Sequence, residues 1–157
     1  MIRRLFQTPD DHLLTMLRLT LGVIFFAHGA QKMLGWFGGF GFTGTMHAFT
    51  GSGIPAPLAF LAIAAEFFGG LGLILGLLGR VAAFGIGVNM AVAIATVHAK
   101  FGLFMNWYGN QKGEGFEYHL LAIAIALTVI IRGSGAFSLD PLIDSERPAA
   151  VPLRRAA

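Results

Sequence analysis

Four long apolar stretches, separated by short polar or glycine-rich segments, dominate the chain. They cover residues 13–34, 57–78, 80–104 and 117–133. Each is close to the roughly 20 helical residues that are needed to cross about 30 Å of hydrocarbon. The pattern therefore predicts an all-α membrane protein, with a four-helix transmembrane bundle formed by residues 1–143.

The connections between these stretches differ in character. Residues 35–56 are uncharged, rich in glycine and aromatic residues, and contain apolar side chains spaced as on one face of a helix. This is typical of a short interfacial or re-entrant helix, which we expect in the first outer loop. Only Gly79 and Arg80 separate the second and third stretches, which predicts a tight turn between antiparallel neighbours.

The composition agrees with a membrane protein. Hydrophobic residues make up 55% of the chain and charged residues 12%, and the mean hydropathy is +0.71. Soluble domains typically contain about 25% charged residues, because their surface faces water. The chain has no cysteine, which excludes thiol–disulfide exchange and thiolate-bound metal or iron–sulfur sites. Any redox role therefore depends on a bound cofactor or substrate.

Lysine and arginine are distributed unevenly between the two sides of the predicted bundle. The side with both termini would carry Arg3, Arg4, Arg80, Arg132, Arg147, Arg154 and Arg155, and the other side Lys32, Lys100 and Lys112. Because positive residues remain preferentially in the cytoplasm, this predicts a multi-pass protein of the bacterial inner membrane with both termini cytoplasmic. Residues 144–157 would form a disordered cytoplasmic tail. The expected partner of the basic residues is the lipid bilayer, and not nucleic acid.

Ionisable residues inside the apolar stretches are the candidates for function. A charge at the bilayer centre costs at least about 2.5 kcal/mol, so such residues are rare and usually face the bundle interior. Counted along the stretches, seven of them fall in the outer half: His28, Lys32, Glu66, His98, Lys100, Glu117 and His119. His28 and Lys32 are four residues apart and share a helix face, where Glu66 is their natural partner. Glu117 could join as a second carboxylate.

Two polar residues are expected outside this cluster. Asn89 is nine residues from His98, half a turn out of phase on an ideal helix, so the two cannot share a face. We therefore expect Asn89 deeper and closer to Arg18. Arg18 itself has structural alternatives, since it could bind backbone carbonyls or extend to the nearby cytoplasmic interface.

Three runs of the chain carry a resemblance to a known family. They are RLTLGVIFFAHGAQKMLGWFGGFGFTGT from Arg18, GIPAPLAFLAIAAEFFGGLGLILGLLGR up to Arg80, and GFEYHLLAIAIALTVIIRGSGAFSLDPLI from Gly115. In content and order they resemble the DoxX family, whose members are four-helix inner-membrane proteins described as oxidoreductases. One related branch is associated with thiosulfate:quinone oxidoreductase. The resemblance implies that the family's polar positions correspond to Arg18, His28, Gly29, Lys32, Glu66, Arg80, Glu117 and Asp140 in this sequence.

The leading hypothesis is a DoxX-like redox protein, or a subunit of a redox complex, that interacts with quinone. Glu66, His28, Lys32 and Glu117 are the candidate catalytic residues, and His28, Lys32, His98, Trp36 and Arg18 the candidate cofactor contacts. A quinone needs an apolar slot, hydrogen bonds to its carbonyl oxygens and a proton path. The electrons would come from a partner redox protein or a second substrate, and the chain could also form a homo-oligomer.

The sequence leaves other functions open. The chain could be a non-catalytic accessory or assembly subunit of a respiratory or redox complex, or a carrier of lipid or another small molecule. Histidine and glutamate at similar depth could in principle bind a metal, or two histidines a haem. No HxxxH or ExxH spacing is present, so no metal site is predicted and haem is a weak alternative.

Overall fold

The computed structural model describes residues 5–143, and within that range it contains helices and no strand. The long helices are α1 (His12–Leu34), α3 (Ala56–Leu75), α4 (Gly79–Ala93) and α5 (Glu117–Arg132). Two short ones are α2 (Gly41–Gly51), in the first connection, and α6 (Asp140–Ile143). The predicted tail, residues 144–157, and the basic pair Arg3 and Arg4 lie outside the described residues.

Three helical segments are long and apolar enough to cross a membrane: His12–Leu34, Ala56–Leu75 and Gly79–Phe101. The third is α4 continued by a π-helical turn, Ile94–His98, and a 3-10 turn, Ala99–Phe101. α5 has 16 residues, which is short for a crossing. Residues 5–143 thus form an all-helical fold with three candidate membrane spans, and α5 is the shorter fourth helix for which a span was predicted.

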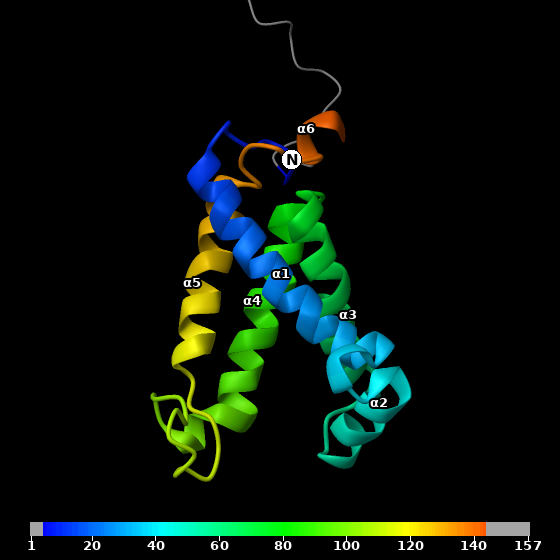
Figure 1. Cartoon of the computed structure of the whole chain (residues 1–157). Helices are drawn as coiled ribbons and strands as arrows, with labels where there is room; N and C mark the ends of the chain where they lie inside the picture. Colours follow the sequence, from blue (N-terminus) through cyan, green and yellow to red (C-terminus); the bar gives the residue numbers. More distant parts are fainter. Residues whose placement is uncertain (1–4, 144–157) are drawn as a thin grey trace, which may run out of the picture.

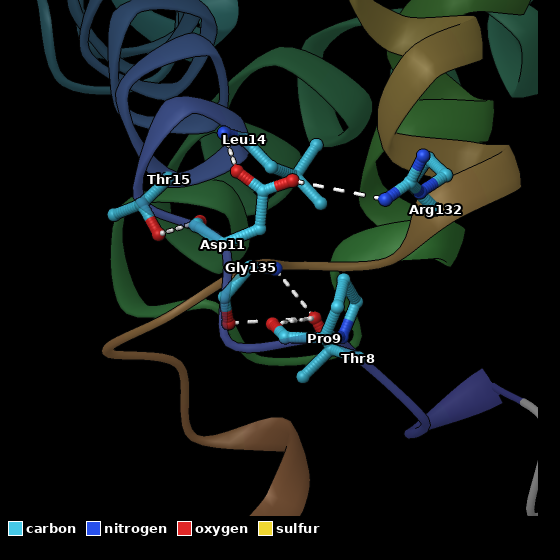
Figure 2. Close-up of polar contacts among 7 residues, drawn as sticks. All are labelled: Thr8, Pro9, Asp11, Leu14, Thr15, Arg132 and Gly135. Carbon is cyan, nitrogen blue, oxygen red and sulfur yellow. Dashed lines mark hydrogen bonds and ion pairs between the residues drawn. The ribbon is translucent and has the colours of Figure 1, made fainter.

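The ends of α1 are defined by local capping. The Asp11 carboxylate accepts a hydrogen bond from the Leu14 amide at 3.0 Å and lies 3.8 Å from the Arg132 guanidinium, which connects the start of α1 to the end of α5 (Figure 2). Gly35 ends the helix in the left-handed region, with φ 76°. Thr8 and Gly135 add a second connection near the start of α1, close to the Asp11–Arg132 pair, since the Gly135 amide donates to the Thr8 hydroxyl at 2.5 Å.

α1 and α3 approach each other more closely than ordinary side chains allow. A Cβ atom on Gly29 would lie 2.4 Å from the Phe67 backbone, and one on Gly70 would lie 2.4 Å from the Phe26 amide nitrogen. Glycine at both positions lets the two backbones touch. The close crossing places the last turn of α1 directly beside the middle of α3.

The long helices form two arms that diverge toward one end of the molecule (Figure 1). α1, α2 and α3 pack together as the first arm, and α4 with α5 as the second. The arms are joined at one end of the molecule, which we call the terminal end and which holds residues 5–11, the α3–α4 turn and α6. They separate toward the opposite end, which we call the loop end and which holds residues 35–55 and 94–116. The core between them contains Leu21, Phe25, Leu73, Ile86, Ala126 and Val129.

Arg18 is buried in the terminal end and binds backbone carbonyls. Its guanidinium donates to Ser134 at 2.6 Å, to Ile74 at 2.9 Å and to Phe137 at 3.3 Å, and also to the carbonyls of Leu73 and Ala136. The carbonyls at the end of α3 carry the negative end of the helix dipole, so a cation is favoured there. Of the two alternatives for Arg18, carbonyl binding is the one observed. The prediction that Asn89 lies near Arg18 is wrong, because Asn89 contacts Glu66 instead.

The α3–α4 turn lies before the predicted Gly79–Arg80. α3 ends at Gly76, with φ 64°, and Leu78, with φ 51°, precedes the first residue of α4. The buried Asp140 carboxylate accepts from the amides of Leu78 at 2.6 Å and Gly79 at 3.2 Å, and from the Ser134 hydroxyl at 2.5 Å. A carboxylate from the C-terminal segment therefore caps α4, which no local pattern in the turn could indicate.

Candidate functional site

A cavity of about 980 Å³ lies between the two arms. Its lining is mostly apolar. Five lining side chains of α3 and α4 are exposed: Leu58, Leu61, Phe84, Val88 and Val92. The cavity is therefore open along the gap between these two helices. The polar side chains in the lining come from both arms: His28, Lys32, Glu66, Asn89, Thr96, His98, Glu114, Tyr118 and His119. A large apolar cavity with a few polar groups is the usual form of a small-molecule site.

The first polar group in the cavity wall is a cluster of three residues, which we call the Glu66 cluster: Lys32, Glu66 and Asn89. Lys32 forms an ion pair with one carboxylate oxygen of Glu66, and the Asn89 amide donates to the other at 3.0 Å. The residues come from α1, α3 and α4. Glu66 is only 6% exposed, whereas the Lys32 side chain is 25% exposed toward the cavity.

The close α1–α3 crossing explains how Lys32 reaches Glu66. A Cβ on Gly29 would meet the Glu66 and Phe67 backbone, so α1 lies against α3 at the level of the carboxylate. Lys32 is three residues after Gly29, on the same side of the helix. The ammonium and carboxylate neutralise each other, which lowers the cost of keeping two charges inside an apolar region. His28 lies one turn earlier and also lines the cavity.

The second polar group consists of Tyr118 and His119 of α5 and His98 from the π-helical turn after α4. We call it the α5 group, after the helix that carries two of its members. The rings of His98 and His119 are 4.1 Å apart at their centroids, and His98 Nδ1 lies 2.8 Å from the Glu114 carbonyl oxygen. A carbonyl can only accept, so His98 carries a proton on Nδ1. The Tyr118 hydroxyl and His119 Nδ1 are buried and have no hydrogen-bond partner among residues 5–143.

The second arm places Asn89 and His98 in the same cavity, although an ideal helix would place them on opposite faces. The π-helical turn at Ile94–His98 explains the difference. A π turn contains more residues than an α turn, so each residue rotates the chain by a smaller angle. Asn89 and His98 therefore both line the cavity, although on an ideal helix they would be half a turn out of phase.

Comparison with known proteins identifies the family. A family model described as DoxX matches residues 13–99, more than half of the chain. The chain belongs to the DoxX family. The DoxX match runs from α1 to the end of the π turn, so it includes the Glu66 cluster, His28 and His98, while the rest of the α5 group lies beyond it.

One curated relative of this DoxX chain is a protein of Bacillus subtilis (strain 168) named "Putative oxidoreductase CatD". The two are 34% identical over 128 residues, which cover 82% of this chain and 84% of the relative. No solved structure gives a significant match. The DoxX family and this relative support a membrane redox-related role.

Three residues proposed from the DoxX sequence do not line the cavity. Glu117 accepts a hydrogen bond from the Trp107 indole at 3.0 Å in the loop end. Trp36 is 51% exposed and packs edge-on against Phe26, and Arg18 is buried at the terminal end. The cavity does bring together His28, Lys32, Glu66 and His98.

Four polar residues of the cavity were not proposed as site residues from the sequence: Asn89, Thr96, Glu114 and Tyr118. Tyr118 carried a signal, since a hydroxyl inside an apolar helix must find a partner. Among residues 5–143, no group of three or more His, Cys, Asp or Glu side chains is arranged to hold a metal ion. The polar side chains that line the cavity are hydrogen-bond donors and acceptors.

Proposed function

We propose that this DoxX-family protein is a quinone-interacting component of a membrane redox system, and that quinone binds in the cavity between the arms. The carrying observation is the Glu66 cluster in the wall of a large apolar cavity. A quinone has an apolar ring and two acceptor oxygens, so it fits a cavity that is apolar except for a few hydrogen-bonding groups. The family and the relative's printed name agree with an oxidoreductase role.

The Glu66 cluster offers donors that are still free for a ligand. Lys32 uses one of its three N–H groups on Glu66, and Asn89 one of its two. A lysine ammonium beside the ring also stabilises the negative charge that develops when a quinone is reduced. Reduction takes up electrons and an equal number of protons. In this proposal a partner redox protein supplies the electrons, and the Lys32–Glu66 pair transmits protons to the ligand.

The membrane placement in this proposal follows the distribution of charge. The terminal end, with Arg80 and Arg132, faces the cytoplasm across the bacterial inner membrane, and the loop end faces outward. α5 completes a four-helix transmembrane bundle, and α2 lies at the outer interface. The gap between α3 and α4 then faces the hydrocarbon, because Leu58, Phe84 and Val92 are exposed along it. A quinone dissolved in the bilayer would enter through that gap.

Quinone binding by the purified protein in lipid nanodiscs tests the proposal, with empty nanodiscs as the background. Glu66→Gln removes the charge that positions Lys32 and Asn89, so we expect the affinity for a benzoquinone with a decyl tail to fall about tenfold, or about 1.4 kcal/mol. Glu117→Gln is the matched control. It makes the same change at the loop end, outside the cavity, and should leave affinity within about twofold.

Equal quinone affinity in wild-type protein and in Glu66→Gln would refute the proposal, provided that both proteins are folded. Absence of quinone binding by the wild type, together with stable co-purification in a larger complex, would favour the accessory-subunit alternative. Correct folding is checked independently by thermal unfolding, because loss of the carboxylate leaves the Lys32 ammonium without its partner.

A further inference from the structure

The α5 group contains two buried polar atoms that make no hydrogen bond within the described part of the chain. The Tyr118 hydroxyl and His119 Nδ1 have no hydrogen-bond partner among residues 5–143, and His119 is only 6% exposed. Both residues line the cavity. Buried polar groups without partners are uncommon and costly, and they call for an explanation such as a ligand.

The Tyr118 ring is held in place by packing rather than by its hydroxyl. It stacks on Phe25, with ring centroids 6.4 Å apart and planes tilted by 23°. Phe25 is almost fully buried in the core. The ring orientation is therefore fixed without any contact from the hydroxyl, which leaves the hydroxyl available for a molecule in the cavity.

The Lys32–Glu66 pair and the Tyr118–His119 pair come from different arms, and Asn89 of α4 links the Glu66 carboxylate to the second arm. Glu66 lies in the middle of α3, and Tyr118 and His119 lie in the first turn of α5. Figure 1 shows α5 and the loop-end half of α3 on separate, diverging arms. The cavity is lined by residues of both arms. The cavity thus has hydrogen-bonding groups on both arms, and the groups on each arm keep unused bonding capacity.

We propose that the ligand is held at two ends, with one acceptor oxygen on the Glu66 cluster and the other on the Tyr118 hydroxyl, with His119 beside it. This rests on the proposed function and extends it, because it assigns each of the two carbonyl oxygens of the quinone to a separate group in the cavity wall. A tyrosine hydroxyl and a neutral histidine can each donate or accept. The same pair can therefore bond a carbonyl oxygen in the oxidised ligand and a hydroxyl in the reduced one.

If the Tyr118 hydroxyl binds the ligand, its removal should weaken ligand binding but not the stability of the ligand-free protein. If the hydroxyl had a structural role, its removal should lower stability. Tyr118→Phe removes only the hydroxyl and keeps the ring on Phe25. Because the hydroxyl has no partner in the described protein, its loss should leave the unfolding temperature of ligand-free protein unchanged or raise it. The same variant should bind the decyl-tailed benzoquinone about threefold to tenfold more weakly, since one hydrogen bond to the ligand is lost.

Equilibrium binding and thermal unfolding of the full chain in nanodiscs test this, with Tyr108→Phe as the matched control. Tyr108 is 91% exposed and does not line the cavity, so its variant should match the wild type in both measurements. Unchanged quinone affinity in Tyr118→Phe would overturn the two-ended arrangement. A large loss of stability or of folding in Tyr118→Phe would also overturn it, because the hydroxyl would then have a structural partner.

Failure of this inference is distinguishable from failure of the proposed function. If wild-type protein binds quinone and Glu66→Gln weakens binding while Tyr118→Phe does not, the quinone site stands and only its second attachment is wrong. If the wild type binds no quinone, the proposed function fails, and the two-ended arrangement fails with it.

Discussion

Gly29→Ala is predicted to loosen the α1–α3 crossing that supports the cavity. The added methyl group would lie 2.4 Å from the Cα and amide nitrogen of Phe67 and 2.6 Å from the Glu66 carbonyl carbon. Ordinary contact begins near 3.4 Å, so the helices must separate locally by about 1 Å. The atoms that the methyl group meets belong to the backbone and cannot rotate away, so the neighbouring helix itself must move.

The magnitude follows from two opposing effects. Overpacking against a rigid backbone costs about 3 kcal/mol, the upper end of the usual range, and the higher helix propensity of alanine offsets about 1 kcal/mol. We therefore expect a net loss of about 2 kcal/mol in the free energy of unfolding. Separation of the helices should also lengthen the Lys32–Glu66 contact, so quinone binding should weaken in the same variant.

Chemical or thermal unfolding in detergent measures the loss, and Gly85→Ala provides the control. A methyl group on Gly85, which lies at the α3–α4 contact, would stand 3.6 Å from the Ala65 Cβ, an ordinary distance. Gly85→Ala should therefore be as stable as the wild type or slightly more stable. If Gly29→Ala were as stable as Gly85→Ala, the argument that backbone contact sets the α1–α3 distance would be refuted.

Three further substitutions test the terminal end by thermal unfolding. Arg18→Leu should lower the free energy of unfolding by more than about 3 kcal/mol, because it leaves several buried carbonyls without a donor. Asp140→Ala should cost about 2 kcal/mol, because it removes the cap of α4 and the acceptor of the Ser134 hydroxyl. Leu78→Gly should raise stability by about 1 kcal/mol, because Leu78 has φ 51° and glycine adopts that conformation without strain.

The outcomes that would contradict these three predictions differ. An Arg18→Leu protein with wild-type stability would show that the carbonyls are satisfied in another way. A neutral Asp140→Ala would mean that the amides of α4 do not depend on the carboxylate. A destabilising Leu78→Gly would mean that the leucine side chain contributes more through packing than its backbone conformation costs.

The membrane helices were predictable because length and hydropathy determine them locally. The apolar runs place α1 and α3 within a few residues of their observed bounds, and the glycine-rich segment 35–56 does contain a helix, α2. The α3–α4 turn was misplaced for a nonlocal reason. Leu78 takes an unusual conformation beside Asp140, a residue far along the chain, and the dipeptide Gly79–Arg80 only resembles a turn.

The site was predictable to the extent that it depends on the cost of charge in a membrane. That cost singled out Glu66 and Lys32, which the structure brings into contact. The position of Asn89 was not predictable, because the rotation of α4 about its own axis depends on packing and on a π turn that periodicity does not reveal. Tyr118 was missed because an aromatic residue in an apolar helix is usually a packing residue.

The separation of the arms toward the loop end also implies that lipid competes with an apolar ligand for the cavity. In the proposed placement, acyl chains of the surrounding bilayer would reach the same gap between α3 and α4, where Leu58, Phe84 and Val92 are exposed. Ligand binding then becomes an exchange with lipid, and the apparent dissociation constant rises with the fraction of the cavity that acyl chains occupy. Hydrocarbon length and unsaturation, which change how well a chain fits the gap, would tune ligand occupancy without any change in the protein.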